Sequence, residues 1–233
     1  MTKRGLSQET LKLIACVTML IDHVGYIFIH QYPWYYVMRV IGRLAFPIYC
    51  FLLAEGAHYT RNPKRYALRL AVGAVLAELP FDLAFFGGWY WGHQNVMVTL
   101  LLGFLALKAM EKCPNLFWKL AVSLPFALAA KLLKTDYSWE GVMLIVLFGL
   151  TREMPHRRLI QLLGMIVISL EMSSFHIPMF GIAVPVQIFG VFAMALIGLY
   201  SGRKATGSKA AQWGFYLFYP AHLCVLYLIG VAG

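Results

Sequence analysis

Long apolar runs, separated by short stretches that contain charged residues, glycine or proline, dominate the pattern along the chain. Such runs are typical of membrane-spanning helices, because a helix needs roughly 20 apolar residues to cross the hydrocarbon layer. We therefore predict an all-α fold, a polytopic transmembrane bundle of about nine spans in a single domain over residues 1–233. The expected spans are 9–30, 36–57, 65–86, 94–110, 116–133, 138–151, 158–173, 179–200 and 211–231.

The basic residues indicate which side of the membrane each connection faces. With the N-terminus in the cytosol, fifteen of the twenty Lys and Arg residues lie on the cytosolic side, as the positive-inside rule requires. These are Lys3, Arg4, Arg61, Lys64, Arg65, Arg69, Lys108, Lys112, Lys119, Arg152, Arg157, Arg158, Arg203, Lys204 and Lys209. Lys131 and Lys134 do not fit this pattern. We expect a multi-pass protein of the cytoplasmic membrane with a cytosolic N-terminus.

Composition excludes several other classes of protein. Hydrophobic residues make up 61% of the chain and charged residues 13%, far from the values of soluble globular domains. The net charge of +10 follows the membrane topology, so it does not indicate nucleic-acid binding. The four cysteines lack the spacing of metal ligands, and neither a metal site nor a disulfide framework is expected.

Ionisable and polar residues at membrane depth are the candidate functional residues, because they are costly to insert and usually face the bundle interior. They are Asp22, His23, Arg39, Arg43, Glu78, Asp82 and Asn95. The two arginines are four residues apart, as are the two acids that follow them, so each pair shares a helix face and a double cation can face a double anion. The spacing predicts one polar chamber formed by several helices.

His23 is the candidate base in this chamber. Asp22 precedes it directly and points about 100° away around the helix axis, so Asp22 is poorly placed to orient the imidazole. We expect the orienting carboxylate to come from another helix, either Asp82 or Glu78. Tyr26 shares a face with His23 and is expected to supply a hydroxyl nearby.

Structural explanations compete with these roles. An ion pair between Asp22 and Arg39 can simply hold two helices together. Glu55 is expected to be a helix end that reaches toward water, and His222 to form an interhelical hydrogen bond. The basic cluster at 58–69 follows from the positive-inside rule and contact with anionic lipid, or it anchors a phosphorylated ligand. Its members are His58, Arg61, Lys64, Arg65 and Arg69.

Several local strings resemble the TraX family. They are LKLIACVTMLIDHVGYIF, RVIGRLAFPIYCFLLAEGAHYTRNPKRYALRL, ELPFDLAF, NVMVTLLLGFLAL and FYLFYPAHL. The likeness is strongest over 10–105 and 213–226. TraX is associated with N-acetylation of conjugative pilin, and it is similar in plan to transmembrane enzymes of the acyltransferase-3 and heparan glucosaminide N-acetyltransferase type.

The resemblance implies a single transmembrane acyltransferase domain that passes an acetyl group from cytosolic acetyl-CoA to an extracytoplasmic acceptor. That acceptor is an amine or a hydroxyl, on a protein amino terminus or a glycan. In the wider superfamily the histidine of the first span is catalytic, which corresponds to His23, and Arg43 corresponds to an essential arginine. An acetyl-histidine intermediate is an open alternative to general-base catalysis.

The chamber residues are given roles on this basis as a hypothesis. His23 acts as the base, while Arg43, assisted by Asn95, stabilises the oxyanion. Asp22, Arg39, Asp82 and Glu78 complete the catalytic group on the strength of their depth alone. The basic residues Arg61, Lys64, Arg65 and Arg69 hold the CoA phosphates. Membrane lipids are the other expected partner.

Two further classes of function are open. A transporter or channel would use the same acids, arginines and histidine as a substrate or proton path. Pro80, Pro125 and Pro185 interrupt expected spans, and helices interrupted by proline are common in transporters. The lack of a visible internal repeat argues against this class. A structural subunit of a conjugation or envelope complex is the third class.

Overall fold

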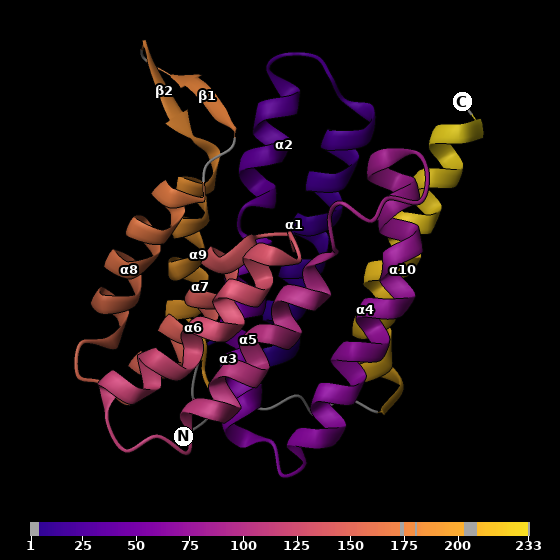
Figure 1. The fold of residues 1–233 in the computed structure, drawn as a ribbon. Helices are drawn as coiled ribbons and strands as arrows, with labels where there is room; N and C mark the ends of the chain where they lie inside the picture. The colour runs from indigo at the N-terminus through magenta and orange to yellow at the C-terminus, as the bar shows by residue number, and fades with distance from the viewer. Residues whose placement is uncertain (1–4, 173–174, 180, 203–208, 233) are drawn as a thin grey trace. The chain divides into compact units, whose positions relative to one another are not determined.

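The computed structural model describes residues 5–172, 175–179, 181–202 and 209–232. The chain forms two compact units. The first unit comprises Met1–Tyr49 and Met165–Gly233, and the second comprises Cys50–Gly164. The described residues are almost entirely helical, apart from one small sheet of two strands (Figure 1). This confirms the all-α character that the apolar runs predict.

Helix α1 (Gln8–Phe28) is the centre of the first unit, and both α2 (Trp34–Gly42) and α10 (Lys209–Ala232) pack against it. Ser7 caps α1, since its hydroxyl accepts the backbone N–H of Thr10 at 3.1 Å. The expected span 36–57 is not one straight helix. It breaks after α2, and α3 (Ala45–Tyr59) begins after a short turn.

The segment expected to span the membrane at 179–200 folds differently. It contributes to the strands β1 (His176–Met179) and β2 (Ile182–Pro185), a 3-10 helix η1 (Val186–Phe192) and a short helix α9 (Ala193–Gly198). The strands pair antiparallel, with Ile177 opposite Val184. Proline at 178 and 185 removes backbone donors that a continuous helix needs, so an apolar composition alone does not produce a helix here.

The second unit contains α4 (Pro63–Phe86), α5 (Val96–Met110), α6 (Leu116–Leu132), α7 (Ser138–Thr151) and the beginning of α8 (Arg157–Glu171). Helix α5 packs against α4, α6 and α7. The interior of the second unit is apolar and closely filled: Phe104, Val142, Ile145 and Phe148 are at most 2% exposed. The core of this unit therefore lies between α5 and α7.

Among the described residues, three helical stretches are long and apolar enough to cross a membrane: Gln8–Phe28, Trp34–Tyr59 and Trp213–Ala232. The expectation of about nine spans is therefore wrong by this measure. Apolar helices such as α5, with 15 residues, reach only about 22 Å at 1.5 Å per residue. Helix α4 has 24 residues, but charged side chains interrupt its apolar surface.

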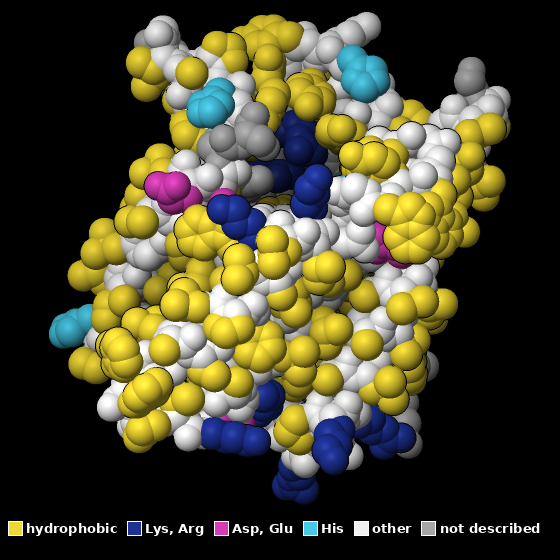
Figure 2. Space-filling view, viewed as in Figure 1, with side chains coloured by type: hydrophobic (Ala, Val, Ile, Leu, Met, Phe, Trp, Pro, Cys, Tyr) yellow, Lys and Arg dark blue, Asp and Glu magenta, His cyan; other side chains and the backbone are white. Residues whose placement is uncertain are grey.

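The surface has the apolar character of a membrane protein. In Figure 2 hydrophobic side chains cover most of the visible face, while Lys and Arg side chains lie along its lower edge and also in a group in its upper half. Leu76, Val75, Leu132 and Phe117 are each more than half exposed. Lys3, Arg4, Arg203 and Lys204, which the topology argument used, lie outside the described residues.

Candidate functional site

Two arginines of the first unit share a single carboxylate. Arg39 Nη1 lies 2.9 Å from Asp22 Oδ1, and Arg43 donates a hydrogen bond to the other oxygen of Asp22. Arg43 Nε also donates to the backbone oxygen of Arg39 at 3.2 Å. The spacing of four residues brings both guanidinium groups to the face of α2 that meets α1. Asp22, Arg39 and Arg43 form what we call the Asp22 cluster.

The Asp22 cluster is buried and unequal in charge. Asp22 is 7% and Arg43 5% exposed, so both groups have lost most of their hydration. Two guanidinium groups face one carboxylate, which leaves an excess of positive charge within the cluster. An excess of this sign suits a site that stabilises a developing oxyanion.

Gly42 permits this arrangement of α1 and α2. A Cβ atom at position 42 would overlap the side chain of Asp22, so a residue larger than glycine would displace the carboxylate from between the arginines. Behind α2, the backbone oxygen of Arg43 faces Gly190 of η1, where a Cβ atom would lie 3.2 Å from that oxygen. The segment that replaces the expected eighth span therefore supports the turn containing Arg43.

His23, next to Asp22 on α1, pairs with His222 of α10. The Nδ1 atom of His23 lies 2.7 Å from Nε2 of His222, and Nδ1 of His222 lies 2.7 Å from the backbone oxygen of Phe218. The two rings are nearly parallel, with an interplanar angle of 6°. His222 is 7% exposed, so its ring is held inside the unit. We call this pair the histidine dyad.

The hydrogen bonds of the dyad determine where its protons lie. A backbone oxygen only accepts hydrogen bonds, so Nδ1 of neutral His222 is the donor to Phe218 and its Nε2 is an acceptor. Nδ1 of His23 must then be the donor between the two rings. The neutral His23 ring therefore has its lone pair on Nε2. An imidazole with this arrangement can remove a proton through Nε2 while His222 accepts the bond from Nδ1.

The structure shows partners of these residues that the sequence did not predict. His222 lies at Nδ1 of His23, where a carboxylate from another helix was expected. The arginine pair contacts Asp22, a carboxylate of its own unit. Each partner is chemically suited to its place. The Asp22 carboxylate can neutralise a nearby cation, and a second imidazole can accept the His23 N–H in place of a carboxylate.

Tyr26 makes a contact that the sequence did not predict. Its ring lies under the Arg39 guanidinium, with 5.2 Å between the ring centroid and Cζ. This is a cation–π contact, which stabilises the position of the guanidinium. The expected interhelical hydrogen bond of His222 is confirmed. Its partner could not be inferred from the sequence, because His23 and His222 are 199 positions apart.

Glu78, Asp82 and Asn95 belong to the second unit, where they connect α4 to the segment before α5. Asn95 is 0% exposed and caps α5, since its Oδ1 accepts the Met97 N–H at 2.9 Å. Its Nδ2 donates to the Ala74 backbone oxygen at 2.9 Å and also to Glu78. Both amide hydrogens are used within the bundle, which argues against the expected role of Asn95 at an oxyanion. Asp82 similarly accepts the Tyr90 N–H at 3.0 Å.

Replacing Asn95 with Ala is expected to destabilise the second unit by about 1–3 kcal/mol, because the Glu78 carboxylate, the Ala74 oxygen and the Met97 N–H each lose a buried partner. The midpoint of thermal unfolding in detergent measures the effect. Gln94→Ala is the control, since its amide makes only an exposed bond to Trp91. An Asn95→Ala midpoint equal to that of the control would contradict the structural role.

The basic residues expected to hold CoA phosphates lie at the turn between α3 and α4. Asn62 caps α4 by accepting the Arg65 N–H at 2.9 Å, so the side chains of Arg61, Lys64 and Arg65 project around an ordered helix start and are exposed. Arg69 lies a turn further along, over the ring of Tyr66 at 5.2 Å. Exposed basic side chains in this arrangement can bind either the phosphates of a ligand or the head groups of anionic lipids.

Comparison with known proteins identifies the family. The sequence profile described as "TraX protein" matches residues 7–230, nearly the whole chain. The chain belongs to the TraX family. The match includes both histidines of the dyad and the whole Asp22 cluster. TraX proteins are membrane-associated and are linked to pilin assembly and fimbrial processing.

Individual relatives agree with this membership. This TraX-family chain is 31% identical over 244 residues to the probable fimbrial assembly protein FimC, serogroup H1, of Dichelobacter nodosus, and the alignment covers 93% of the chain and 92% of the relative. It is 30% identical over 96 residues to the uncharacterized protein RP591 of Rickettsia prowazekii, covering 41% of the chain and 34% of that protein. No solved structure matches the chain.

Proposed function

We propose that this TraX-family chain is a multi-pass acetyltransferase of the cytoplasmic membrane, which moves an acetyl group from cytosolic acetyl-CoA to an acceptor amine or hydroxyl on the extracytoplasmic side. The observation that carries the proposal is the histidine dyad directly beside the Asp22 cluster on α1. Acyl transfer from a thioester requires a base for the acceptor proton and a positive group for the oxyanion. His23, with its defined tautomer, and the Asp22 cluster, with its excess positive charge, supply them. Family membership supports a role in pilin modification.

In the proposed reaction, Nε2 of His23 removes the proton of the acceptor as its nitrogen or oxygen attacks the thioester carbonyl. His222 accepts the hydrogen bond from Nδ1 and holds the imidazolium in place. The Asp22 cluster stabilises the negative charge on the tetrahedral oxygen, an effect that is worth roughly 2.7–4 kcal/mol for one well-placed donor. The C–S bond then breaks, and the CoA thiolate takes the proton from His23.

The donor is proposed to enter from the side that bears the basic turns. Arg61, Lys64, Arg65 and Arg69 carry positive charge at the α3–α4 turn, and guanidinium groups match the geometry of phosphate oxygens. For the acceptor, the relative from Dichelobacter nodosus is named as a fimbrial assembly protein. The amino terminus of a fimbrial subunit is therefore the first acceptor to test.

The full-length chain, purified and reconstituted into liposomes, is expected to release CoA and to transfer radiolabelled acetyl from acetyl-CoA to a synthetic peptide with a fimbrial-subunit amino terminus. The same peptide with a blocked amino group is the control. Label transfer to the free amine alone supports the proposal. Folded protein that neither releases CoA nor transfers label, yet carries solute across the bilayer without acetyl-CoA, would instead indicate a transporter.

A further inference from the structure

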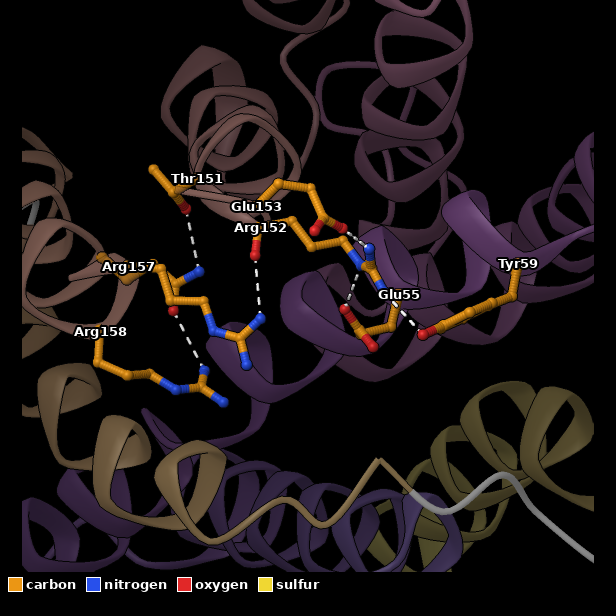
Figure 3. Close-up of polar contacts among 8 residues, drawn as sticks. Glu55, Tyr59, Thr151, Arg152, Glu153, Arg157 and Arg158 are labelled. Atoms are coloured by element: carbon orange, nitrogen blue, oxygen red, sulfur yellow. Dashed lines mark hydrogen bonds and ion pairs between the residues drawn. The ribbon is translucent and has the colours of Figure 1, made fainter. Parts of the chain in front are cut away.

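The turn between α7 and α8, in the second unit, surrounds a hollow of about 560 Å³. Its lining includes three arginines and a histidine: Arg152, His156, Arg157 and Arg158. Pockets that bind small ligands have volumes of about 300–1,000 Å³, and this hollow falls in that range. Figure 3 shows the three arginines with the groups that hold them.

Arg152 is fixed from two sides. Its Nε donates to Glu55 Oε1 at 2.8 Å and its Nη2 to the Tyr59 hydroxyl at 2.7 Å, and its guanidinium also lies over the Tyr59 ring. Burial opposes the charge most strongly, but Glu55, Tyr59 and Glu153 together outweigh that cost and raise the pKa of Arg152. Glu55 is therefore an ion-pair partner, rather than the water-directed helix end that its sequence position suggested.

Arg157 and Arg158 are held by neutral oxygens instead. Arg157 Nη1 donates to the Arg152 backbone oxygen at 2.9 Å, and Arg158 Nη1 donates to Gln161 Oε1 at 3.2 Å. Gln161 is 2% exposed, and its Nε2 donates to the Thr151 hydroxyl at 3.0 Å. A chain of hydrogen bonds inside the unit therefore fixes the Arg158 guanidinium at the hollow.

The charges around the hollow are not balanced. Arg152 has ion pairs with Glu55 and Glu153, but within the described ranges no carboxylate lies within ion-pair distance of Arg157 or Arg158. These two like charges are adjacent in sequence and both line the hollow. His156 beside them has a positive φ of 54°, a conformation that is uncommon for residues other than glycine. Guanidinium groups that are held by neutral oxygens, with no carboxylate in ion-pair contact among the described residues, favour a bound anion.

We propose that the hollow at the α7–α8 turn binds the phosphate groups of a phosphorylated ligand. Arg152 and Glu153 also line an adjoining hollow of about 260 Å³. Its wall combines apolar residues with charged or titratable ones: Ala54, Leu107 and Leu150, and His58, Glu111 and Lys119. Phosphate binding beside a partly apolar space suits a ligand with a phosphorylated head and a less polar arm. Acyl-CoA has this form and so does an anionic phospholipid; with acyl-CoA as the ligand, the inference rests on the proposed function.

Binding measurements on the purified full-length chain test the site. The probes are desulfo-CoA, which carries the CoA phosphates but cannot react, and phosphatidylglycerol, each titrated in an uncharged detergent. Replacing both Arg157 and Arg158 with Gln is expected to weaken binding of at least one probe by about tenfold or more. The Arg→Lys double variant should lose less, because it keeps the charge without the planar fork.

The charge-matched control is Lys131→Gln with Lys134→Gln. Lys131 lies in the last turn of α6 and Lys134 lies just beyond it; both are exposed and neither lines the hollow. We expect less than a twofold change with it. Loss of desulfo-CoA binding alone identifies the nucleotide donor as the ligand, and loss of phosphatidylglycerol alone identifies a lipid head group.

Unchanged affinity for both probes, in a double Gln variant with a wild-type unfolding midpoint, would overturn the site. The proposed function fails separately, since it requires acetyl transfer that depends on His23. An inactive wild-type chain that still loses desulfo-CoA affinity in the Arg157/Arg158 variant would refute the transferase and keep the phosphate site.

Discussion

Replacing His23 with Ala is expected to lower the rate of acetyl transfer by about 10²–10⁴-fold, the usual contribution of a positioned general base. In the neutral dyad, Nε2 of His23 carries the lone pair that is not used in the bond between the two rings, and this variant removes it. Transfer of radiolabelled acetyl by purified protein measures the rate. Desulfo-CoA affinity should stay within about twofold of wild type if His23 acts in chemistry rather than in donor binding.

His30→Ala is the matched control for this variant, because His30 is an exposed histidine just beyond the same helix. It should retain wild-type activity. His222→Gln separates positioning from packing: its amide oxygen can accept the His23 N–H, whereas His222→Phe cannot. We expect the Gln variant to be more active than the Phe variant at equal thermal stability. Full transfer activity in folded His23→Ala would show that another group is the base.

Replacing Gly42 with Ala is expected to reduce both stability and activity. The added methyl group would overlap Asp22, and the carboxylate would move away from Arg39 and Arg43. Overpacking of a filled interior costs about 1–3 kcal/mol, and separating a buried ion pair raises the cost toward 3–5 kcal/mol. The midpoint of thermal unfolding in detergent and the transfer rate should therefore fall together.

Gly214→Ala provides the comparison, because a Cβ atom at that position of α10 meets nothing within 4 Å. Since alanine favours helix over glycine by about 1 kcal/mol, this variant should be at least as stable as wild type. If Gly42→Ala unfolds at the same temperature as Gly214→Ala, then the close approach of α1 and α2 does not depend on glycine. The positioning of the Asp22 cluster would then need another explanation.

The sequence predicted most helices well, because their ends carry local signals. Asn62 and Asn95 stand at the starts of α4 and α5 and cap them, and Gly87 follows the end of α4 in a left-handed conformation. Hydropathy predicted a spanning helix at 179–200 that does not form, and it predicted too many spans. It measures apolar composition and carries no information about backbone hydrogen bonding. Proline and glycine in that segment favour a hairpin and a 3-10 helix over one long helix.

The candidate site was only partly predictable. The i, i+4 spacing is readable, so Arg39 and Arg43 could be placed on one helix face, and a structural ion pair between Asp22 and Arg39 was among the expectations from the sequence. Contacts between distant segments are not, and both the His23–His222 bond and the Arg152–Glu55 pair are of this kind. Which polar groups satisfy one another depends on packing, so Asn95 was assigned to chemistry although its amide is used in holding α4 to α5.

The dyad joins α1 to α10, and its two members are 199 positions apart in the sequence. During synthesis, His23 leaves the ribosome long before His222 does, so the nascent protein carries an unsupported imidazole until α10 has been inserted. Competence for proton transfer therefore arrives only once α10 is in place. A chain that stops short of α10 should be inert, even with every other helix in place.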